Sequence, residues 1–252
     1  MPFTISHAAA VLPFLRTRLN FSALVIGAMS PDFEYILMWK FSKTIAHSPL
    51  GLFVFCIPVG LLFFYLYHRL WKRIIIDCLP TPWRRRIMYT MVHREHNDAD
   101  DRWYYIVPAI LIGAITHQVL DVFSHSYGWG ANLLPLLKEP SPWLGLYYWH
   151  FSFGLMSLAG LAALYFAIRR WYVRTPELEH CPPRRIRLPW FAVIGIAVGG
   201  IDFIWFFAWL RHHANTTGLQ TIAHTLLGAM IFITLALTLI GLGANLWLRR
   251  KD

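Results

Sequence analysis

Charged side chains are scarce in this chain. Asp, Glu, Lys and Arg make up 14% of its 252 residues, whereas hydrophobic residues make up 57%. Soluble domains are usually about a quarter charged, so most of the surplus apolar surface must face lipid or a very large core. The hydrophobic residues come in long blocks and not in amphipathic stripes, which favours lipid over an unusually large core as their surroundings.

Cysteine and acidic residues are also few. Cys56, Cys78 and Cys181 are an odd set without CxxC spacing, which argues against a disulfide framework. The 13 acidic residues against 23 basic ones give a net charge of +10. No nucleic-acid motif accompanies this charge, and the basic residues lie at the ends of hydrophobic blocks, where they meet anionic lipid. We therefore expect the lipid bilayer, and not nucleic acid, as the partner.

Five hydrophobic blocks reach the length of roughly 20 residues with which a helix crosses a bilayer. They are Leu50 to Tyr67, Tyr104 to Ser124, Phe151 to Ile168, Trp190 to Leu210 and Thr221 to Leu248. Helices are expected because backbone groups in lipid need internal partners. The sequence predicts an all-α, polytopic membrane helix bundle. It is expected to be one domain over 1–252, with an N-terminal helical or re-entrant segment (1–49), motif-bearing helices (50–149) and C-terminal membrane helices (150–252).

The loops between these blocks predict the orientation. Arg and Lys crowd the loop between the first and second blocks, the loop between the third and fourth, and the C-terminal tail. The other two loops hold only Lys138 and Arg211. By the positive-inside rule the crowded loops and the C-terminus are cytoplasmic, in an inner (plasma) membrane. His117, Asp121 and several other His and Asp residues then fall in the outer half of the bilayer.

The stretch ITHQVLDVFSHSYGW carries His117, Asp121 and His125 at four-residue intervals inside a hydrophobic block. Residues four apart stack on one face of a helix, so His117 and Asp121 can reach the same point. Imidazole and carboxylate are ligands that Zn²⁺ takes in catalytic sites. His125 lies one turn further, where it can bind a second ion or orient the first ligands. The alternative is that these side chains only form hydrogen bonds between helices, although ionisable groups in a membrane are costly.

Four motifs, in this order, resemble the domain-of-unknown-function 4184 family of bacterial membrane proteins. They are MPFTISHAAAVLP, LVIGAMSPDFEYIL, AHSPLGL and THQVLDVFSHSYGWG. A broader similarity is to predicted membrane-bound metal-dependent hydrolases and to zinc-dependent phospholipase C. That class is all-helical and presents an early His, then Asp, His, a helical H-x-x-x-D and a further His. The matching residues are His7, Asp32, His47, His117, Asp121 and His125.

The resemblance implies a site with one or two divalent ions, with Zn²⁺ expected. Asp32, His47, His117 and Asp121 would hold one ion. His7 would help to hold a second, with Asp121 bridging the two, and His125 is a further candidate ligand. Asp32 and Asp121 would also be catalytic, since either carboxylate can orient or deprotonate water. Ser48, Ser124, Ser126 and Tyr127 are expected around the ligands.

Several alternatives stay open. Asp32 can cap a helix or close a turn, His47 can be an interfacial residue, and His7 can be structural. The stretch Phe21 to Trp39 is interrupted by Pro31, Asp32 and Glu34, so it is either a broken span or a re-entrant segment. A full span would leave His7 on the cytoplasmic side, far from His117. A re-entrant segment, the version that we prefer, would allow His7 to join the cluster.

Three functions fit these patterns. The leading one is a membrane-bound, metal-dependent hydrolase of a phosphoester or lipid, because a metal ion activates water and polarises a phosphoryl oxygen. The second is a transporter or a protein that binds a cation or proton, with the same His and Asp residues as a transit site. The third is a noncatalytic scaffold whose polar residues join helices.

Overall fold

The computed structural model describes residues 4–34, 45–93, 102–124, 130–142 and 147–184, with a few positions between 234 and 241. Its ordered elements in these ranges are helical, and Pro140 and Tyr147 form one isolated β-bridge. The prediction of an all-α fold is confirmed for this part of the chain. The elements are η1 (Thr4–Arg16), α1 (Phe21–Met29), η2 (Ser30–Asp32), η3 (Ile45–His47), α3 (Pro49–Gly51), η4 (Leu52–Cys56), α4 (Ile57–Leu66), η5 (Tyr67–Trp71), α5 (Lys72–Cys78), α6 (Thr81–His93), α7 (Trp103–Ser124), α8 (Gly130–Leu133), η7 (Pro135–Lys138) and α9 (Tyr148–Arg174).

Three helices in the described ranges are long and apolar enough to cross a membrane. They are Pro49–Cys78, Trp103–Phe123 and Tyr148–Arg174, with mean hydropathies of 2.3, 1.8 and 1.9. They match the first three blocks expected from the sequence, apart from Ser124 at the end of the second block. The other two blocks, in the C-terminal third, lie outside the described residues apart from a few positions. The chain is thus compatible with a membrane protein, and the count of five spans stays a prediction.

The first of these helices is longer than the sequence suggested. It continues beyond the expected end at Tyr67 to Cys78, through η5 and α5. Arg and Lys are good helix formers, so the basic residues after Tyr67 mark the end of the hydrophobic block and not the end of the helix. The helix stops where Leu79 turns to an extended backbone conformation (φ −64°, ψ 148°) before Pro80.

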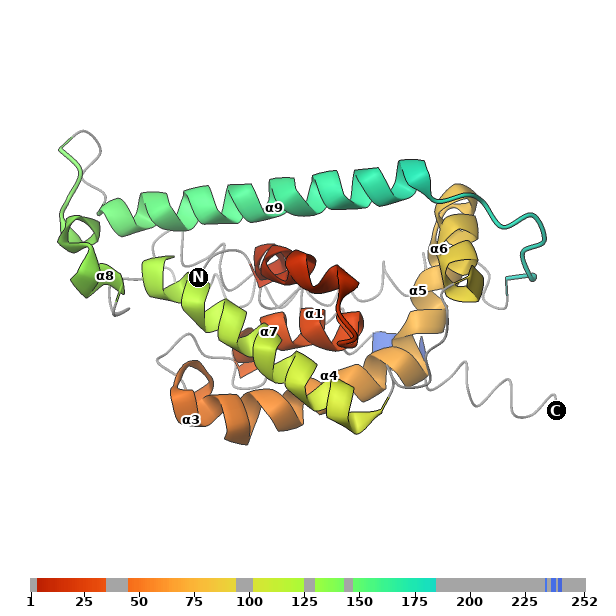
Figure 1. Ribbon diagram of the computed structural model, residues 1–252, viewed down its shortest axis with the longest axis horizontal. Helices are drawn as coiled ribbons and strands as arrows, with labels where there is room; N and C mark the ends of the chain where they lie inside the picture. The colour runs from red at the N-terminus through yellow and green to blue at the C-terminus, as the bar shows by residue number, and fades with distance from the viewer. Residues whose placement is uncertain are drawn as a thin grey trace, which may run out of the picture. The chain divides into compact units, whose positions relative to one another are not determined.

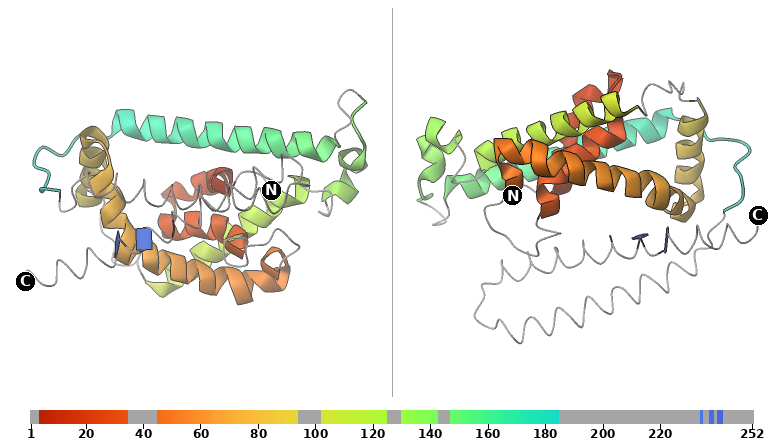
Figure 2. Two further views of the ribbon diagram at one scale, coloured as in Figure 1. Left: turned by 180° about the vertical axis from the view of Figure 1, so that it is seen from behind. Right: turned by 90° about the horizontal axis from the view of Figure 1, so that it is seen from below.

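The chain forms two compact units. Unit 1 contains Met1–Glu34, Ser42–Phe64 and Glu95–Thr175, and unit 2 contains Tyr35–Phe41, Tyr65–Arg94 and Pro176–Asp252. In unit 1, α7 lies beside α1, which Figures 1 and 2 show from several sides. In the same unit, η1 packs against both α1 and α9. The core of unit 1 is therefore built by η1, α1 and α7.

Helix α1 is short because its two ends are fixed locally. The side chain of Asn20 caps its start by accepting the Ala23 N–H at 3.1 Å. Its α-helical part ends at Met29, and the 3₁₀ turn η2 follows with Pro31 inside it. Asp32 closes this turn, so the predicted interruption of Phe21–Trp39 begins here. Residues 35–39 lie outside the described ranges, and the choice between a broken span and a re-entrant segment stays open.

Two glycines let α1 and α7 approach closely. A Cβ atom on Gly27 would lie 2.2 Å from the carbonyl oxygen of Ile110, and one on Gly113 would lie 2.3 Å from that of Leu24. Neither position has room for a side chain, because backbone atoms occupy the space on both sides. The core around this contact consists of Val11, Ala23, Leu24, Ala28, Ile106, Ala109 and Ile110. The contact brings the end of α1 alongside the middle of α7, from Ile110 to His117.

Helix α9 contacts η1 through a third glycine. A Cβ atom on Gly160 would lie 2.7 Å from the carbonyl oxygen of Ser6, the residue before His7. The apolar part of α9 otherwise buries none of its residues in the described structure. A hydrophobic helix of this kind is typical of one that faces lipid. Its contact with η1 fixes the segment that carries His7.

Unit 2 contains a buried ion pair that joins α5, α6 and the segment after α9. The guanidinium of Arg84 donates to Asp77 Oδ1 from Nε (3.3 Å) and Nη2 (3.2 Å), and both residues are buried. Nη2 also donates to the carbonyl oxygen of Pro182 at 2.8 Å, and Nη1 donates to the sulfur of Cys181 at 2.9 Å. Arg84 thereby fastens residues 181 and 182 to α6.

Candidate metal centre

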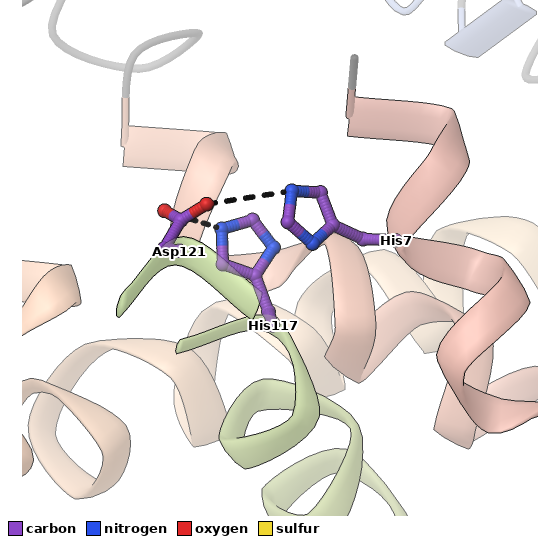
Figure 3. Close-up of side chains that lie close together, drawn as sticks. All are labelled: His7, His117 and Asp121. Carbon is purple, nitrogen blue, oxygen red and sulfur yellow. Dashed lines mark ion pairs between the residues drawn. The ribbon is translucent and has the colours of Figure 1, made fainter. Parts of the chain in front are cut away.

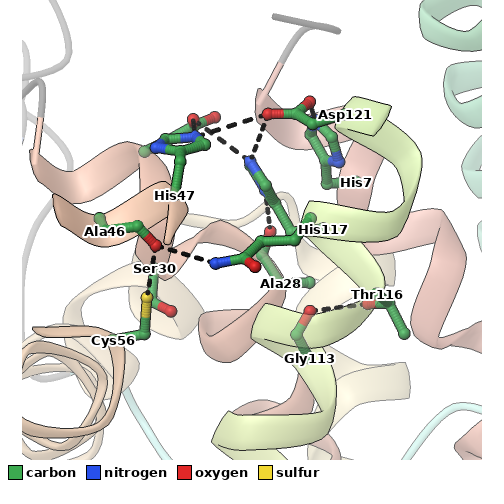
Figure 4. Close-up of polar contacts among 12 residues, drawn as sticks. His7, Ala28, Ser30, Ala46, His47, Cys56, Gly113, Thr116, His117 and Asp121 are labelled. Atoms are coloured by element: carbon green, nitrogen blue, oxygen red, sulfur yellow. Dashed lines mark hydrogen bonds and ion pairs between the residues drawn. The ribbon is translucent and has the colours of Figure 1, made fainter. Parts of the chain in front are cut away.

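Helix α7 supplies two of the candidate ligands from consecutive turns. Nε2 of His117 lies 3.4 Å from Oδ2 of Asp121, four residues further along. Both side chains are buried in unit 1. They point to the same place because residues four apart stack on one helical face, as the sequence predicted. Figure 4 shows these side chains facing His47.

Two short turns bring the next two candidate ligands. Asp32 ends η2, immediately after α1, and its carboxylate is 2% exposed as part of a buried turn. His47 ends η3, just before the first candidate span, and its side chain is 13% exposed. Asp32 Oδ1 lies 3.5 Å from His117 Nε2 and 3.7 Å from His47 Nε2. These contacts join three segments that are far apart in the sequence.

The two imidazoles and the two carboxylates alternate around a common point. His47 Nε2 lies 3.5 Å from Asp121 Oδ2, which completes a ring of nitrogen–oxygen distances between 3.4 and 3.7 Å. Charge-assisted N–H···O hydrogen bonds are shorter, at about 2.7–2.9 Å. Two ligands of one tetrahedral zinc ion, each ~2.0–2.2 Å from it, are ~3.3–3.6 Å apart. The spacing therefore fits atoms that share a cation better than atoms that bond directly to one another.

His7 approaches the same centre from η1. Its Nε2 lies 3.6 Å from Asp121 Oδ1, whereas the nitrogens of His47 and His117 lie beside Oδ2 (Figure 3). Its ring also stacks on that of His117, with 3.8 Å between the ring centres. The two oxygens of Asp121 thus face different imidazoles, His7 on one side and His47 and His117 on the other. A carboxylate in this position has the arrangement needed to bridge two ions.

A backbone contact fixes which nitrogen of His117 is free to bind. Nδ1 of His117 lies 2.8 Å from the carbonyl oxygen of Ala28, and because a carbonyl only accepts, Nδ1 must carry the hydrogen. In the neutral ring the lone pair is then on Nε2, which faces the carboxylates. Nε2 of His117 and both ring nitrogens of His7 are buried without a hydrogen-bond partner among the described residues. Buried polar atoms without a partner are uncommon and point to a missing ligand.

The pKa values of three groups outside the candidate spans, His47, His7 and Asp32, are shifted from their ordinary values. Burial alone lowers the pKa of His47, but Asp121 and Asp32 outweigh burial and raise it to about 9. Burial and the neighbouring His117 lower the pKa of His7 to about 3, so that its ring is neutral. Burial opposes ionisation of Asp32, yet the adjacent imidazoles hold the pKa of this carboxyl below its ordinary value. Both carboxylates thus attract positive charge into the centre.

The donor set suits a divalent cation. Two groups of described residues bring their ligand atoms within 4.8 Å of one another, namely His7, His117 and Asp121, and Asp32, His47 and His117. Imidazole nitrogen and carboxylate oxygen are ligands of Zn²⁺. A divalent ion would also balance the charge of two carboxylates that are buried in an apolar unit, where unbalanced charge is costly. The residues present therefore fit a metal ion.

The structure brings together five of the six candidate ligands expected from the sequence. His7, Asp32, His47, His117 and Asp121 meet in unit 1, whereas His125 lies outside the described residues. The question of whether η1 lies near α7 is answered by the contact of His7 with Asp121. Asp32 closes a turn, as the alternative had it, and at the same time faces the two imidazoles.

Two residues near the centre were not singled out as functional from the sequence. Glu34 Oε2 accepts the Ala46 N–H at 2.7 Å, and Gln118 Nε2 donates to the carbonyl oxygen of Ala46 at 3.0 Å. Their positions beside Asp32 and His117 were the only available signal. Ser48, expected near the ligands, caps α3 by accepting the Gly51 N–H at 3.0 Å. The side chains of Ser124, Ser126 and Tyr127 lie outside the described residues.

Comparisons with known proteins give a family for this chain. No curated protein and no solved structure matches it. A family model described as "Domain of unknown function (DUF4184)" matches residues 1–245. This range includes all five residues of the centre, which fall within the motifs that suggested the family. The chain therefore belongs to the family described as domain of unknown function DUF4184.

Proposed function

We propose that this chain is a membrane-bound, metal-dependent hydrolase of a phosphoester, with a lipid as the expected substrate. The observation that carries the proposal is the ring of Asp32, His47, Asp121 and His117, whose facing atoms lie 3.4–3.7 Å apart. In this proposal the four residues hold one divalent ion, with Zn²⁺ expected. His7 and the second oxygen of Asp121 are the ligands proposed for a second ion.

The chemistry divides between the ion and the chain. A bound divalent ion supplies Lewis acidity toward a phosphoryl oxygen and lowers the pKa of water. Either Asp32 or Asp121 orients a water molecule through its carboxylate and accepts one proton from it. The contact of His117 with the Ala28 carbonyl keeps its imidazole in one tautomer during turnover. His47 is the most exposed member of the ring, and we expect a substrate to enter beside it.

The position of the centre relative to the candidate spans supports a lipid substrate. Asp121 lies two residues before the end of the span Trp103–Phe123, and His47 lies two residues before the start of the span Pro49–Cys78. At the opposite end, Arg102 directly precedes the helix Trp103–Phe123, and Lys72 and Arg73 lie near the end of the helix Pro49–Cys78. By the positive-inside rule those ends are cytoplasmic, which puts the centre at the outer boundary of the inner membrane. Lipid headgroups lie at that depth.

The test combines metal content with turnover. Protein purified in detergent without chelators should contain Zn²⁺ or another divalent ion, and it should hydrolyse a phosphodiester or a phospholipid in mixed micelles. His117→Ala and Asp121→Ala should lose both the metal and the activity. His93→Ala, which changes an exposed histidine of α6 in unit 2, should keep both.

Each outcome bears on a different alternative. Wild-type protein without metal after purification and after incubation with Zn²⁺ would contradict the proposal and favour a scaffold. Metal binding without hydrolysis of any phosphoester, together with uptake of the cation into proteoliposomes, would favour a transporter. Hydrolysis that persists in Asp121→Ala would move the catalytic site elsewhere.

A further inference from the structure

The turn that carries His47 is held by side chains of other segments, namely Glu34, Gln118 and, through a longer contact of 3.5 Å, Cys56. It consists of η3, Ile45–His47, and leads directly into the first candidate span. Ala46, in the middle of η3, is fully buried. Buried backbone N–H and C=O groups need partners, and a turn of three residues supplies few of its own. The partners of Ala46 therefore come from outside the turn.

The backbone N–H and C=O groups of Ala46 are bound by side chains of different segments. Its N–H donates to Glu34 Oε2 at 2.7 Å, and its carbonyl oxygen accepts from Gln118 Nε2 at 3.0 Å. Gln118 Nε2 also lies 3.3 Å from the carbonyl oxygen of Ser48, so it donates to the residues before and after His47. Both partners of Gln118 are carbonyls, which fixes its amide nitrogen as the group that faces the turn.

The two side chains follow candidate ligands in the sequence. Glu34 lies two residues after Asp32, and Gln118 is the residue after His117. Neighbours in a helix point about 100° apart, so Gln118 reaches the turn while His117 faces the centre. Three ligand-bearing segments are thus tied together at Ala46, one residue before His47. Figure 4 shows Ala46 and His47 beside His117 in this arrangement.

We propose that Glu34 and Gln118 are positioning residues that hold His47 in place to bind the metal ion. This inference rests on the proposed metal centre and adds to it the groups that set its affinity. His47 is the ring member with the most exposed side chain, and its turn is only three residues long. Without the hydrogen bonds of Glu34 and Gln118, the turn loses contacts that fix the orientation of the His47 imidazole toward Asp32 and Asp121. Loss of a supporting hydrogen bond typically weakens metal binding by about 10–100-fold.

The experiment compares Gln118→Leu with Thr116→Val in full-length protein. Thr116 also lies beside His117 on α7, but its hydroxyl donates to the Gly113 carbonyl of the same helix at 2.7 Å and does not contact the turn. Affinity is measured by competition for Zn²⁺ with a chelator, and geometry by the visible absorption of bound Co²⁺. Gln118→Leu should bind Zn²⁺ about 10–100-fold more weakly and change the Co²⁺ spectrum, whereas Thr116→Val should stay within about twofold of wild type.

A second pair of variants tests Glu34 and does not depend on the Gln118 variant folding. Glu34→Gln keeps an oxygen that accepts the Ala46 N–H, and Glu34→Leu does not. We expect Glu34→Gln to preserve most of the Zn²⁺ affinity and Glu34→Leu to lose about 10–100-fold. Equal losses in both variants would indicate that Glu34 acts through its charge or as a ligand, which overturns the positioning role.

The two proposals fail in different ways. If wild-type protein takes up neither Zn²⁺ nor Co²⁺, the metal centre is wrong and the positioning role falls with it. If wild-type protein binds the ions and Gln118→Leu and Glu34→Leu bind them equally well, only the positioning role is wrong. A fall in thermal stability without a change in affinity would also overturn it, because it would assign Glu34 and Gln118 to folding alone.

Discussion

His117 donates its Nδ1 hydrogen to the carbonyl oxygen of Ala28, which lies 2.8 Å away and 89 residues earlier in the chain. Ala28 is near the end of α1, and the contact forms because α1 and α7 approach closely at Gly27 and Gly113. This hydrogen bond sets the tautomer that directs Nε2 toward Asp32 and Asp121. Helix packing and the chemistry of the centre are thereby linked through one backbone oxygen.

Substitution of Gly113 by alanine should damage both the packing and the centre. The new Cβ would lie 2.3 Å from the Leu24 carbonyl oxygen and 2.6 Å from the Ala28 nitrogen, so α1 must move away from α7. We expect a loss of about 1–3 kcal/mol in the free energy of unfolding, together with weaker Zn²⁺ binding. Thermal unfolding in detergent and Zn²⁺ competition measure the two effects.

The matched control is Gly154→Ala on α9, where nothing lies within 4 Å of the added Cβ. Alanine is the better helix former, so this variant should be as stable as wild type or more stable by up to about 1 kcal/mol. Equal behaviour of the two alanine variants would contradict the role assigned to the α1–α7 contact.

The two oxygens of Asp121 predict different metal stoichiometries for the ligand variants. His7 faces Oδ1 alone, whereas His47 faces Oδ2. If Asp121 bridges two ions, His7→Ala should lose one ion per chain and keep the other. Asp121→Ala should lose both, because each ion loses a ligand. Elemental analysis of the purified variants gives the counts, and a wild-type content of one ion that is unchanged in His7→Ala would contradict the second position.

The metal-free protein should be most stable near pH 6.5. The folded pKa of His47 is about 9 against an ordinary 6.5, so the folded protein keeps a proton that the unfolded chain releases, and stability falls as the pH rises between these values. The folded pKa of His7 is about 3, so between pH 3 and 6.5 the unfolded chain binds a proton that the folded protein lacks, and stability falls as the pH drops. The lowered pKa of Asp32 acts in the same direction at acidic pH.

Thermal unfolding of chelator-treated protein across this pH range measures the effect. Metal binding needs unprotonated imidazoles and competes with their protons. Saturation with Zn²⁺ should therefore remove the decline above pH 6.5 and steepen the decline at acidic pH. Identical profiles with and without Zn²⁺ would argue against His47 as a ligand.

The buried ion pair of unit 2 should matter for stability and not for metal binding. Arg84→Ala would leave the buried carboxylate of Asp77 without its guanidinium, and it would free Pro182 from α6. Breaking a buried pair from one side costs about 3–5 kcal/mol. Arg85→Ala removes a more exposed pair with Glu177 and should cost less than about 1 kcal/mol. Thermal unfolding compares the two, and equal losses would contradict the distinction.

Much of the helical pattern could be predicted from hydropathy alone. The three candidate spans among the described residues match the first three of the five expected blocks, and helices are expected there because every backbone group in lipid needs an internal partner. The end of the first helix at Cys78 could not be predicted from hydropathy, since Lys and Arg end a hydrophobic block without ending a helix. Likewise, the interruption after Met29 was visible from Pro31 and Asp32, but the backbone path through it was not.

The spacing of His117 and Asp121 predicted that they share a point, because helical geometry acts locally. Asp32, His47 and His7 were expected at the same point only through the family resemblance, since no local rule relates residues so distant in the chain. Glu34 and Gln118 carried no recognisable pattern. Their role depends on the buried backbone of Ala46, which only the folded chain reveals.

The sequence by itself determined that the described chain is helical and hydrophobic, and that α7 presents an imidazole and a carboxylate on one face. Periodicity and composition suffice for this, because a helix fixes the directions of its own side chains. Only the tertiary structure decided that η1, η2 and η3 bring three further donors to that face. The physical reason is that two glycines allow α1 to contact α7 closely, and the resulting contact, not any local preference, sets the distances between donors that lie far apart along the chain.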